Sequence, residues 1–230
     1  MIKSSIIQYL DNHPPAKCLF DKLLSIGEVY LIGGVLREYR DHKAIKNLRD
    51  IDIVVDVKQN KAWDDIICEY FSKANRFGGN KLRCDDLLMD VWSIDQTWAY
   101  RNECVHCNRN QYFEYLPETV FLNIDGIIFD WKNEVWNDAK YKAAMESKIL
   151  DVVLPQNPQL CLNILRAFIL QKRYEMTLSD RLKQIICCEA QKYDSISHFA
   201  DLLMEEQGHR YQRIILDHSE VEKMIASQVL

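Results

Sequence analysis

The stretch RDIDIVVD, residues 49–56, is an apolar run typical of a buried β-strand, and yet it carries Asp50 and Asp52. Successive side chains of a strand point to opposite faces, so these two acids share one face. The other face carries the aliphatic residues Ile51, Ile53 and Val55. An Asp-x-Asp pair alone is most often the solvated face of an amphipathic strand. The rest of the sequence must therefore supply partners before the pair indicates a metal site.

The composition is that of a globular chain. Its 230 residues are 48% hydrophobic, enough for one large domain or for a compact domain with a helical appendage. A formal net charge of −5 argues against a general polyanion binder, which needs clustered Lys and Arg. The eight cysteines are scattered among apolar residues, as is typical of reduced thiols. No stretch approaches the roughly 20 apolar residues that span a bilayer, so we expect a soluble cytoplasmic protein with no membrane partner.

Local patterns predict an α+β fold, in which a part with both strands and helices is followed by an all-helical region. The first part is expected to begin with two short helices before residue 27, followed by a strand at 28–32 that ends at Gly33-Gly34 and a helix after these glycines. A helix over about 60–75, a β-hairpin over 78–95 with its turn near 84–86, and strands within 120–136 are expected to follow. Helix-forming patterns fill most of the chain after residue 138. We therefore expect two domains, 1–137 and 138–230.

Three features together indicate triphosphate chemistry: Gly33-Gly34 after one strand, Asp50 and Asp52 on the next, and Asp90 on a later strand. Mg²⁺ prefers carboxylate oxygens and keeps substrate phosphates among its ligands. Two such ions about 3.5–4 Å apart activate an attacking hydroxyl and neutralise the leaving pyrophosphate. We therefore predict Asp50, Asp52 and Asp90 as the catalytic, metal-binding residues, with Mg²⁺ as the metal and Mn²⁺ as the alternative.

The glycine pair predicts a phosphate-binding turn. Gly33 and Gly34 offer backbone N–H groups at the start of a helix, whose positive end favours phosphate. Arg37 lies one turn into that helix. We predict that its guanidinium contacts a phosphate or braces the acidic strand.

Two stretches carry a resemblance to a known family. YLIGGVLREY (30–39) is similar to the Gly-Gly-x-x-Arg-Asp element of the poly(A) polymerase and CCA-adding enzyme family, within the polymerase β-like nucleotidyltransferase superfamily. Glu38 stands in place of the usual acid. NLRDIDIVV (47–55) resembles the catalytic Asp-x-Asp strand of the same family, so Asp50 and Asp52 match it residue by residue.

The resemblance continues toward the C-terminus. NIDGIIFD (123–130) is similar to the family's Thr-Ile-Asn-Ala-Leu-Ala-Tyr-Asp segment and places Asp125 where the family has Asn. NILRAFILQKRYEMTLSDRLKQII (163–186) resembles the neck helix pair that begins with Ile-Leu-Arg-Ala, so Arg166 lies on the neck. The resemblance covers about residues 28 to 190.

The resemblance implies a nucleotidyltransferase head at 1–137, with a mixed β-sheet of about five strands flanked by helices, and a helical neck and C-terminal region at 138–230. It implies Mg²⁺-dependent transfer of a nucleoside monophosphate from ATP or CTP to an acceptor hydroxyl, with an RNA (tRNA) 3′ end as the first candidate. The nucleotide-binding residues that it implies are Gly33, Gly34, Arg37, Asp125 and Arg166.

Departures from the family favour a reduced, stand-alone member. Thr119 and Val120 occupy the positions of the family's paired arginines. Its base-reading Glu-Asp-x-x-Arg motif falls on Gln159, Leu160 and Asn163. Protein- or small-molecule-modifying nucleotidyltransferases of bacterial toxin and defence systems therefore stay as an alternative, as does a nucleotide-binding module without turnover. The acceptor, the preferred base and the oligomeric state are left open.

Three further groups of residues have less specific patterns. CVHC (104–107) contains the Cys-x-x-Cys that begins many zinc sites, but no second pair with matching spacing follows, so reduced cysteines are favoured and metal binding is left open. Trp92, Trp98, Tyr100 and Tyr112 are candidates for stacking on a base, with core packing favoured for Trp92. Arg76, Lys81 and Arg83 are interpreted either as a positive rim near Asp90 or as a charged hairpin edge.

Overall fold

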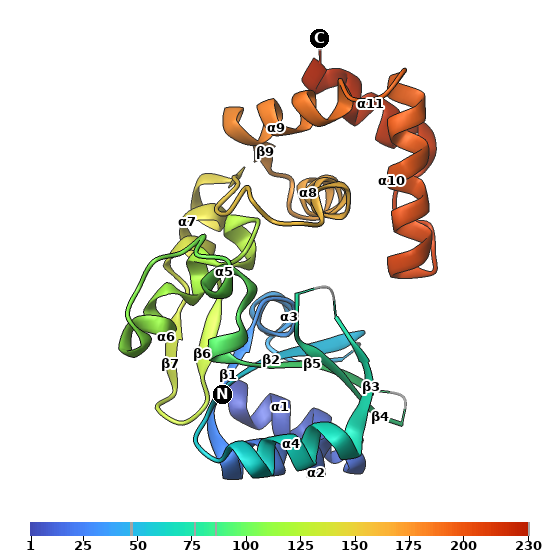
Figure 1. Cartoon of the computed structure of the whole chain (residues 1–230). Coiled ribbons are helices and arrows are strands. Elements are labelled where there is room, and N and C mark those ends of the chain that lie inside the picture. Colours follow the sequence, from blue (N-terminus) through green and yellow to red (C-terminus); the bar gives the residue numbers. More distant parts are fainter. Residues whose placement is uncertain (47, 76, 86, 230) are drawn as a thin grey trace. The chain divides into compact units, whose positions relative to one another are not determined.

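The computed structural model of the chain describes residues 1–46, 48–75, 77–85 and 87–229, and these residues form the two compact units drawn in Figure 1. The N-terminal unit consists of Met1–Thr119 and Asp125–Lys140, and the C-terminal unit of Val120–Ile124 and Tyr141–Leu230. The units are defined by packing alone. The functional division into a head at 1–137 and a helical region at 138–230 stays a prediction.

A mixed sheet is the centre of the N-terminal unit. Among the described residues it has seven strands, in the order β3-β4-β5-β2-β1-β6-β7. The strands are β1 (Gly27–Ile32), β2 (Asp50–Val57), β3 (Phe71–Ala74), β4 (Asn80–Cys84), β5 (Leu87–Ser93), β6 (Ile128–Asp130) and β7 (Val135–Asn137). The pair β2–β5 is parallel, and the other pairs are antiparallel. The predicted mixed sheet is confirmed, with more strands than the resemblance implied.

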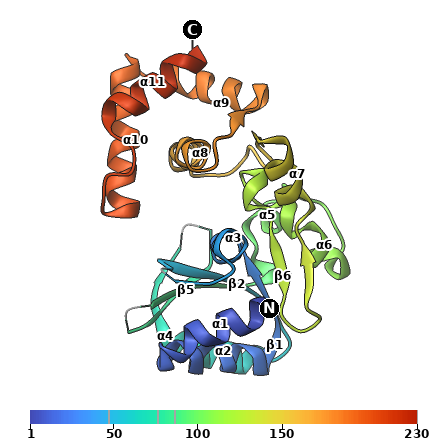
Figure 2. The same cartoon turned by 180° about the vertical axis from the view of Figure 1, so that it is seen from behind.

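Helices cover both faces of this sheet. They are α1 (Ile2–Asp11), α2 (Pro14–Ile26), α3 (Gly34–His42) and α4 (Asn60–Tyr70). Figures 1 and 2 show α1, α2 and α4 on one face and α3 on the other. Strand β2 lies between β5 and β1, so its core residues Ile51, Ile53 and Val55 are buried as predicted. Val54 lies on the same strand face as Asp50 and Asp52 and is also fully buried, because a strand inside a doubly covered sheet is shielded on both sides.

One expectation for this unit needs correction, and another is confirmed. The helix predicted over 60–75 ends at Tyr70, and Phe71–Ala74 pairs with β4 as an exposed edge strand. The hairpin predicted over 78–95 is present as β4 and β5, with Asp85 in a left-handed conformation at φ 53°. The last residue of its predicted turn, Asp86, lies outside the described residues.

Short elements connect β5 to β6. They are the 3₁₀ turns η1 (Ile94–Gln96), η2 (Arg109–Gln111), η3 (Leu116–Glu118) and η4 (Asn123–Asp125), and the single-turn helices α5 (Trp98–Arg101) and α6 (Tyr112–Tyr115). The strand character expected within 120–136 is confined to β6 and to Val135–Trp136 of β7, which form an antiparallel hairpin.

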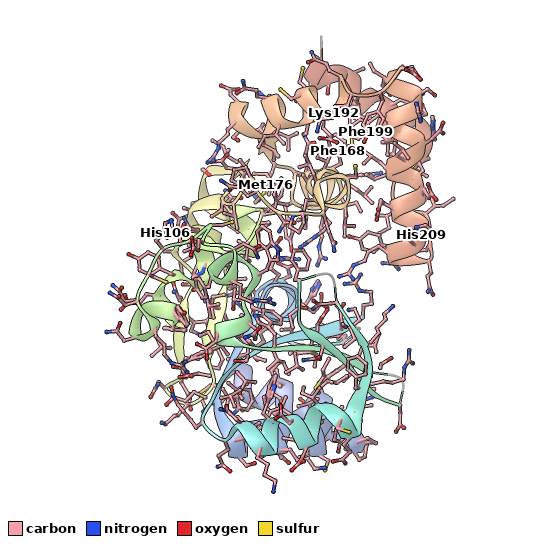
Figure 3. The ribbon with its side chains drawn as sticks, viewed as in Figure 1. His106, Phe168, Met176, Lys192, Phe199 and His209 are labelled. Carbon is pink, nitrogen blue, oxygen red and sulfur yellow. The ribbon has the colours of Figure 1, made fainter. Side chains whose placement is uncertain are left out.

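The C-terminal unit is mainly helical, as the sequence predicts. Its elements are most of α7 (Ala139–Ser147), then α8 (Leu160–Tyr174), α9 (Asp180–Ala190), α10 (Ile196–Tyr211) and α11 (His218–Val229), with a small parallel pair of β8 (Ile149–Leu150) and β9 (Thr177–Leu178). Figure 3 labels Phe168 on α8 and Phe199 on α10, and both side chains are fully buried. No helix in the described ranges has the length and apolar character needed to cross a membrane.

Candidate active site

Three carboxylates meet where β2 and β5 run side by side. The parallel register sets Asp52 opposite Asp90, and Asp50 lies two residues before Asp52 on the same face. One carboxylate oxygen from each of the three residues lies within 4.8 Å of the others. Asp50 and Asp52 are half-buried, and Asp90 is only 7% exposed. We call Asp50, Asp52 and Asp90 the acidic cluster.

Cationic and amide groups surround this cluster. The Nη2 atom of Arg49 donates to both carboxylate oxygens of Asp50, at 2.9 and 2.8 Å. On β4, Lys81 Nζ lies 2.7 Å from Asp90 Oδ2. Asn75 Nδ2 donates to the other oxygen of Asp90, at 2.5 Å. Of these donors, only Lys81 was singled out from the sequence, as part of a positive rim near Asp90 or of a charged hairpin edge.

The composition of the acidic cluster fits a hard divalent cation. Mg²⁺ and Mn²⁺ are bound by carboxylate oxygens, and all three side chains here are carboxylates. In the part of the chain that the structure describes, no other group of three His, Cys, Asp or Glu side chains converges in this way. Asp50, Asp52 and Asp90 would therefore hold the metal, which would supply charge neutralisation for a triphosphate.

The glycine turn lies beside the cluster. Gly33 caps α3 with φ 69° and ψ −119°, and a Cβ built on it would be 3.9 Å from Asp52 Oδ2. Its own N–H donates to the carbonyl of Ile127 at 3.1 Å. The N–H groups of the first helical turn, at Gly34 and Val35, have no acceptor within the helix. These groups, and not the N–H of Gly33, are the ones suited to a phosphate.

Arg37 and Asp125, both predicted to bind nucleotide, contact each other. The guanidinium of Arg37 forms an ion pair with Asp125 Oδ1, and the two side chains are 12% and 8% exposed. This contact joins α3 to the segment before β6. Arg37 therefore braces α3 through Asp125, and its contact with a phosphate or with the acidic strand stays a prediction.

The predicted neck residues belong to the C-terminal unit. Arg166 lies on α8 and is half-buried. Asn163, at one position of the base-reading motif, is 4% exposed and donates through Nδ2 to Asn157 Oδ1 at 2.6 Å. Nucleotide contact by Arg166 stays a prediction.

The aromatic candidates form small groups of their own. Tyr100 and Tyr112 stack with ring centroids 4.4 Å apart, and the Tyr100 hydroxyl donates to the Tyr112 carbonyl at 2.8 Å. Trp92 is half-buried, and its Nε1 donates to Thr97 Oγ1 at 3.1 Å. Trp98 contacts Phe77 edge to face, with centroids 6.4 Å apart. A role for these rings in base stacking stays a prediction.

The remaining candidates form no metal-binding group among the described residues. Cys104, His106 and Cys107 do not converge with other ligands on a common point, and burial raises the pKa of the Cys107 thiol, which disfavours the thiolate. Figure 3 shows His106 in the loop region after α5. Arg83 is exposed on β4, and Arg76, the third residue of the predicted rim, lies outside the described residues.

Asn75 is a site residue that the sequence analysis missed. Its Oδ1 accepts the N–H groups of Phe77 and Gly79, at 2.9 and 2.8 Å, which fixes the amide so that Nδ2 points at Asp90. The pattern Asn75-x-x-Gly78-Gly79 is a signal for this kind of turn. It identifies the turn but not its contact with Asp90.

The fold places the chain in a structural class. A mixed sheet followed by a mainly helical region is a fold that this chain shares with solved nucleotidyltransferase structures. The similar solved structures are CCA-adding and tRNA nucleotidyltransferase enzymes, at about 16% sequence identity. At that identity the likeness shows the fold alone.

Three solved structures illustrate the likeness. A CCA-adding enzyme in complex with ATP has a TM-score of 0.57 at 16% identity, over 87% of this chain and 46% of that one. A tRNA nucleotidyltransferase with a primer tRNA and an incoming ATP analogue has a TM-score of 0.57 at 17% identity, over 87% of this chain and 57% of that one. The Thermotoga maritima CCA-adding enzyme with tRNA has a TM-score of 0.55 at 16% identity, over 87% of this chain and 46% of that one.

This chain spans about half the length of these structures. No protein-family model matches the sequence. No curated protein matches it either.

Proposed function

We propose that the chain is a Mg²⁺-dependent nucleotidyltransferase that moves a nucleoside monophosphate from an NTP to an acceptor hydroxyl. The observation that carries the proposal is the acidic cluster: three carboxylates within 4.8 Å, held by the register of two neighbouring strands. The fold supports it, because the similar solved structures are nucleotidyltransferases.

Each part of the site has a distinct role in this proposal. Asp50 and Asp52 would hold the Mg²⁺ that neutralises the triphosphate, and Asp90 would help to hold the Mg²⁺ that activates the acceptor hydroxyl. The first turn of α3 binds a phosphate through the N–H groups of Gly34 and Val35. Gly33 brings that turn against Asp52, and Arg37 fixes the helix through Asp125.

The substrate is ATP or CTP, and the acceptor is an RNA 3′ end such as that of tRNA. Solved structures with this fold contain ATP, CTP or tRNA, which supports both choices. At the base-reading positions this chain has Gln159, Leu160 and Asn163, and the Asn163 amide is engaged by Asn157. We therefore propose that the chain does not alternate between CTP and ATP through that motif.

A nucleotide-binding module without turnover is the second candidate. The observation that favours it is that cations already contact two members of the acidic cluster, Arg49 at Asp50 and Lys81 at Asp90. A module of this kind would bind an NTP and transfer nothing. Such a module would keep the fold but would not require a metal ion next to an acceptor hydroxyl.

Label transfer separates the two candidates. The purified chain is incubated with each of four α-labelled NTPs, with Mg²⁺ or Mn²⁺, and with either total RNA or cell lysate. Label in RNA from ATP or CTP is the expected result, and label in protein or in small molecules identifies a different acceptor. Label in no fraction with either metal would contradict the nucleotidyltransferase and favour the binding module.

A further inference from the structure

Of the two cations described above in contact with the acidic cluster, Lys81 is the more buried. It lies on β4 directly opposite Asp90 in the antiparallel register, and its side chain is 13% exposed. Arg49, which contacts Asp50, is 42% exposed and lies nearer to solvent. The Lys81 ammonium is therefore screened less than the Arg49 guanidinium, and its charge acts more strongly on the cluster.

Asp90 does not need Lys81 to hold its orientation. Asn75 already binds Asp90 Oδ1, and the Asn75 amide is fixed in turn by the N–H groups of Phe77 and Gly79. The Lys81 ammonium contacts the other oxygen, Oδ2, at 2.7 Å. It neutralises the carboxylate, while Asn75 positions it.

An ammonium and a divalent ion at one carboxylate repel each other. At separations of a few ångströms the repulsion between like charges is large in a partly buried site. A lysine side chain has a flexible four-carbon stem and a single point charge, so it can leave the carboxylate without moving the strand.

We propose that Lys81 is an internal counter-ion of the acidic cluster, and that a divalent ion binding at Asp90 displaces the Lys81 ammonium from Oδ2. This inference rests on the proposed function, because it takes the cluster as the metal site. Without metal, Lys81 offsets the repulsion among three carboxylates and keeps them together. With metal, its displacement opposes binding and sets the metal affinity lower than the carboxylates alone would give.

The test is the affinity of the full chain for Mn²⁺ alone, measured by titration calorimetry. Lys81→Met is expected to bind Mn²⁺ about tenfold more tightly than the wild type, because nothing has to be displaced. The metal-free variant is expected to melt at a lower temperature, since the cluster loses its counter-ion. Lys81→Arg retains the charge and is expected to stay within about threefold of the wild type.

A control at a second lysine makes the result specific, and a substitute variant covers a failure to fold. Lys132→Met removes a lysine from an exposed pair with Glu28, at 2.9 Å, and is expected to leave Mn²⁺ affinity unchanged. If Lys81→Met does not fold, Lys81→Gln takes its place, because it removes the charge and keeps a donor for Asp90.

The outcomes separate this inference from the proposed function. One outcome is that the wild type binds Mn²⁺, that Asp52→Asn abolishes this binding, and that Lys81→Met binds Mn²⁺ no more tightly than the wild type. This outcome overturns the counter-ion role of Lys81 and leaves the metal site intact. No Mn²⁺ binding by the wild type or by any Lys81 variant contradicts the metal site itself, and this inference falls with it.

Discussion

Gly33 has a backbone conformation that residues with a side chain avoid, with φ 69° and ψ −119°. Its N–H donates to Ile127, and its carbonyl accepts the N–H groups of Leu36 and Arg37, each at 3.1 Å. One residue thereby connects β1, α3 and the segment before β6, beside Asp52. The neighbouring Gly34 is an ordinary helical residue with open space around it.

The two glycines should respond differently to the same substitution. Gly33→Ala is expected to destabilise the chain by about 1–3 kcal/mol, because alanine must adopt a positive φ. Gly34→Ala is expected to cause no loss of stability, since its Cβ meets nothing within 4 Å. Urea unfolding of both variants measures the difference, and equal stabilities would contradict a special role for the Gly33 conformation.

At the residue scale, the acids were easier to predict than their partners. The strand period places Asp50 and Asp52 on one face, and the pair predicts a metal site only together with Gly33-Gly34 and with Asp90 on a later strand. The contacts of Asp90 with Lys81 and Asn75 depend on the register between β4 and β5 and on a turn that closes back on β5. No local pattern specifies that register, so Lys81 was predicted only as part of a positive rim or of a charged hairpin edge.

Helix α3 is held to the sheet by a buried ion pair. Arg37 and Asp125 are separated by 88 positions, and their side chains are 12% and 8% exposed. A buried charge without its partner is costly, because the low-polarity surroundings do not solvate it. The pair thus fixes the glycine turn at the start of α3.

Breaking this pair from its two sides should give unequal losses. Arg37→Met is expected to cost about 3–5 kcal/mol, because it leaves the Asp125 carboxylate buried without the guanidinium. Asp125→Asn is expected to cost less, about 1–2 kcal/mol, since an amide oxygen still accepts from Arg37. Chemical denaturation of the two single variants and the double variant measures the coupling. Independent, additive losses would contradict an energetic link between the two side chains.

At the element scale, periodic segments were predicted well and short ones were not. The strand at 28–32, the Asp-x-Asp strand and the later helices have strong periods, and the structure confirms them. The strand Phe71–Ala74 was missed because all four of its residues are exposed and it is defined only by pairing with β4. The β8–β9 pair was missed for the same reason, since two-residue strands leave no pattern in the sequence.

At the scale of the whole molecule, the chain combines a sheet-centred unit with a mainly helical unit. The acidic cluster, the glycine turn and the Arg37–Asp125 pair all belong to the N-terminal unit, so that unit alone carries the proposed chemistry. Arg166 and the base-reading positions belong to the C-terminal unit. Because the chain spans about half of the solved structures it resembles, acceptor and base choice remain proposals about the whole protein.

The most direct test of the account compares two aspartates on one strand face. Asp52 belongs to the acidic cluster, whereas Asp56 lies further along β2 and pairs with Lys58 and Arg109. The measurement is the rate of label transfer from an α-labelled NTP with Mg²⁺, for Asp52→Asn and for Asp56→Asn as the matched control, after circular dichroism shows that both are folded. We predict that Asp52→Asn lowers the rate by about 10²–10³-fold, since it removes a charge that holds the metal.

Asp56→Asn is predicted to stay within about threefold of the wild-type rate, because the exposed pairs that it breaks contribute little. A transfer rate in Asp52→Asn equal to that of the wild type would contradict the claim that the acidic cluster is the catalytic site.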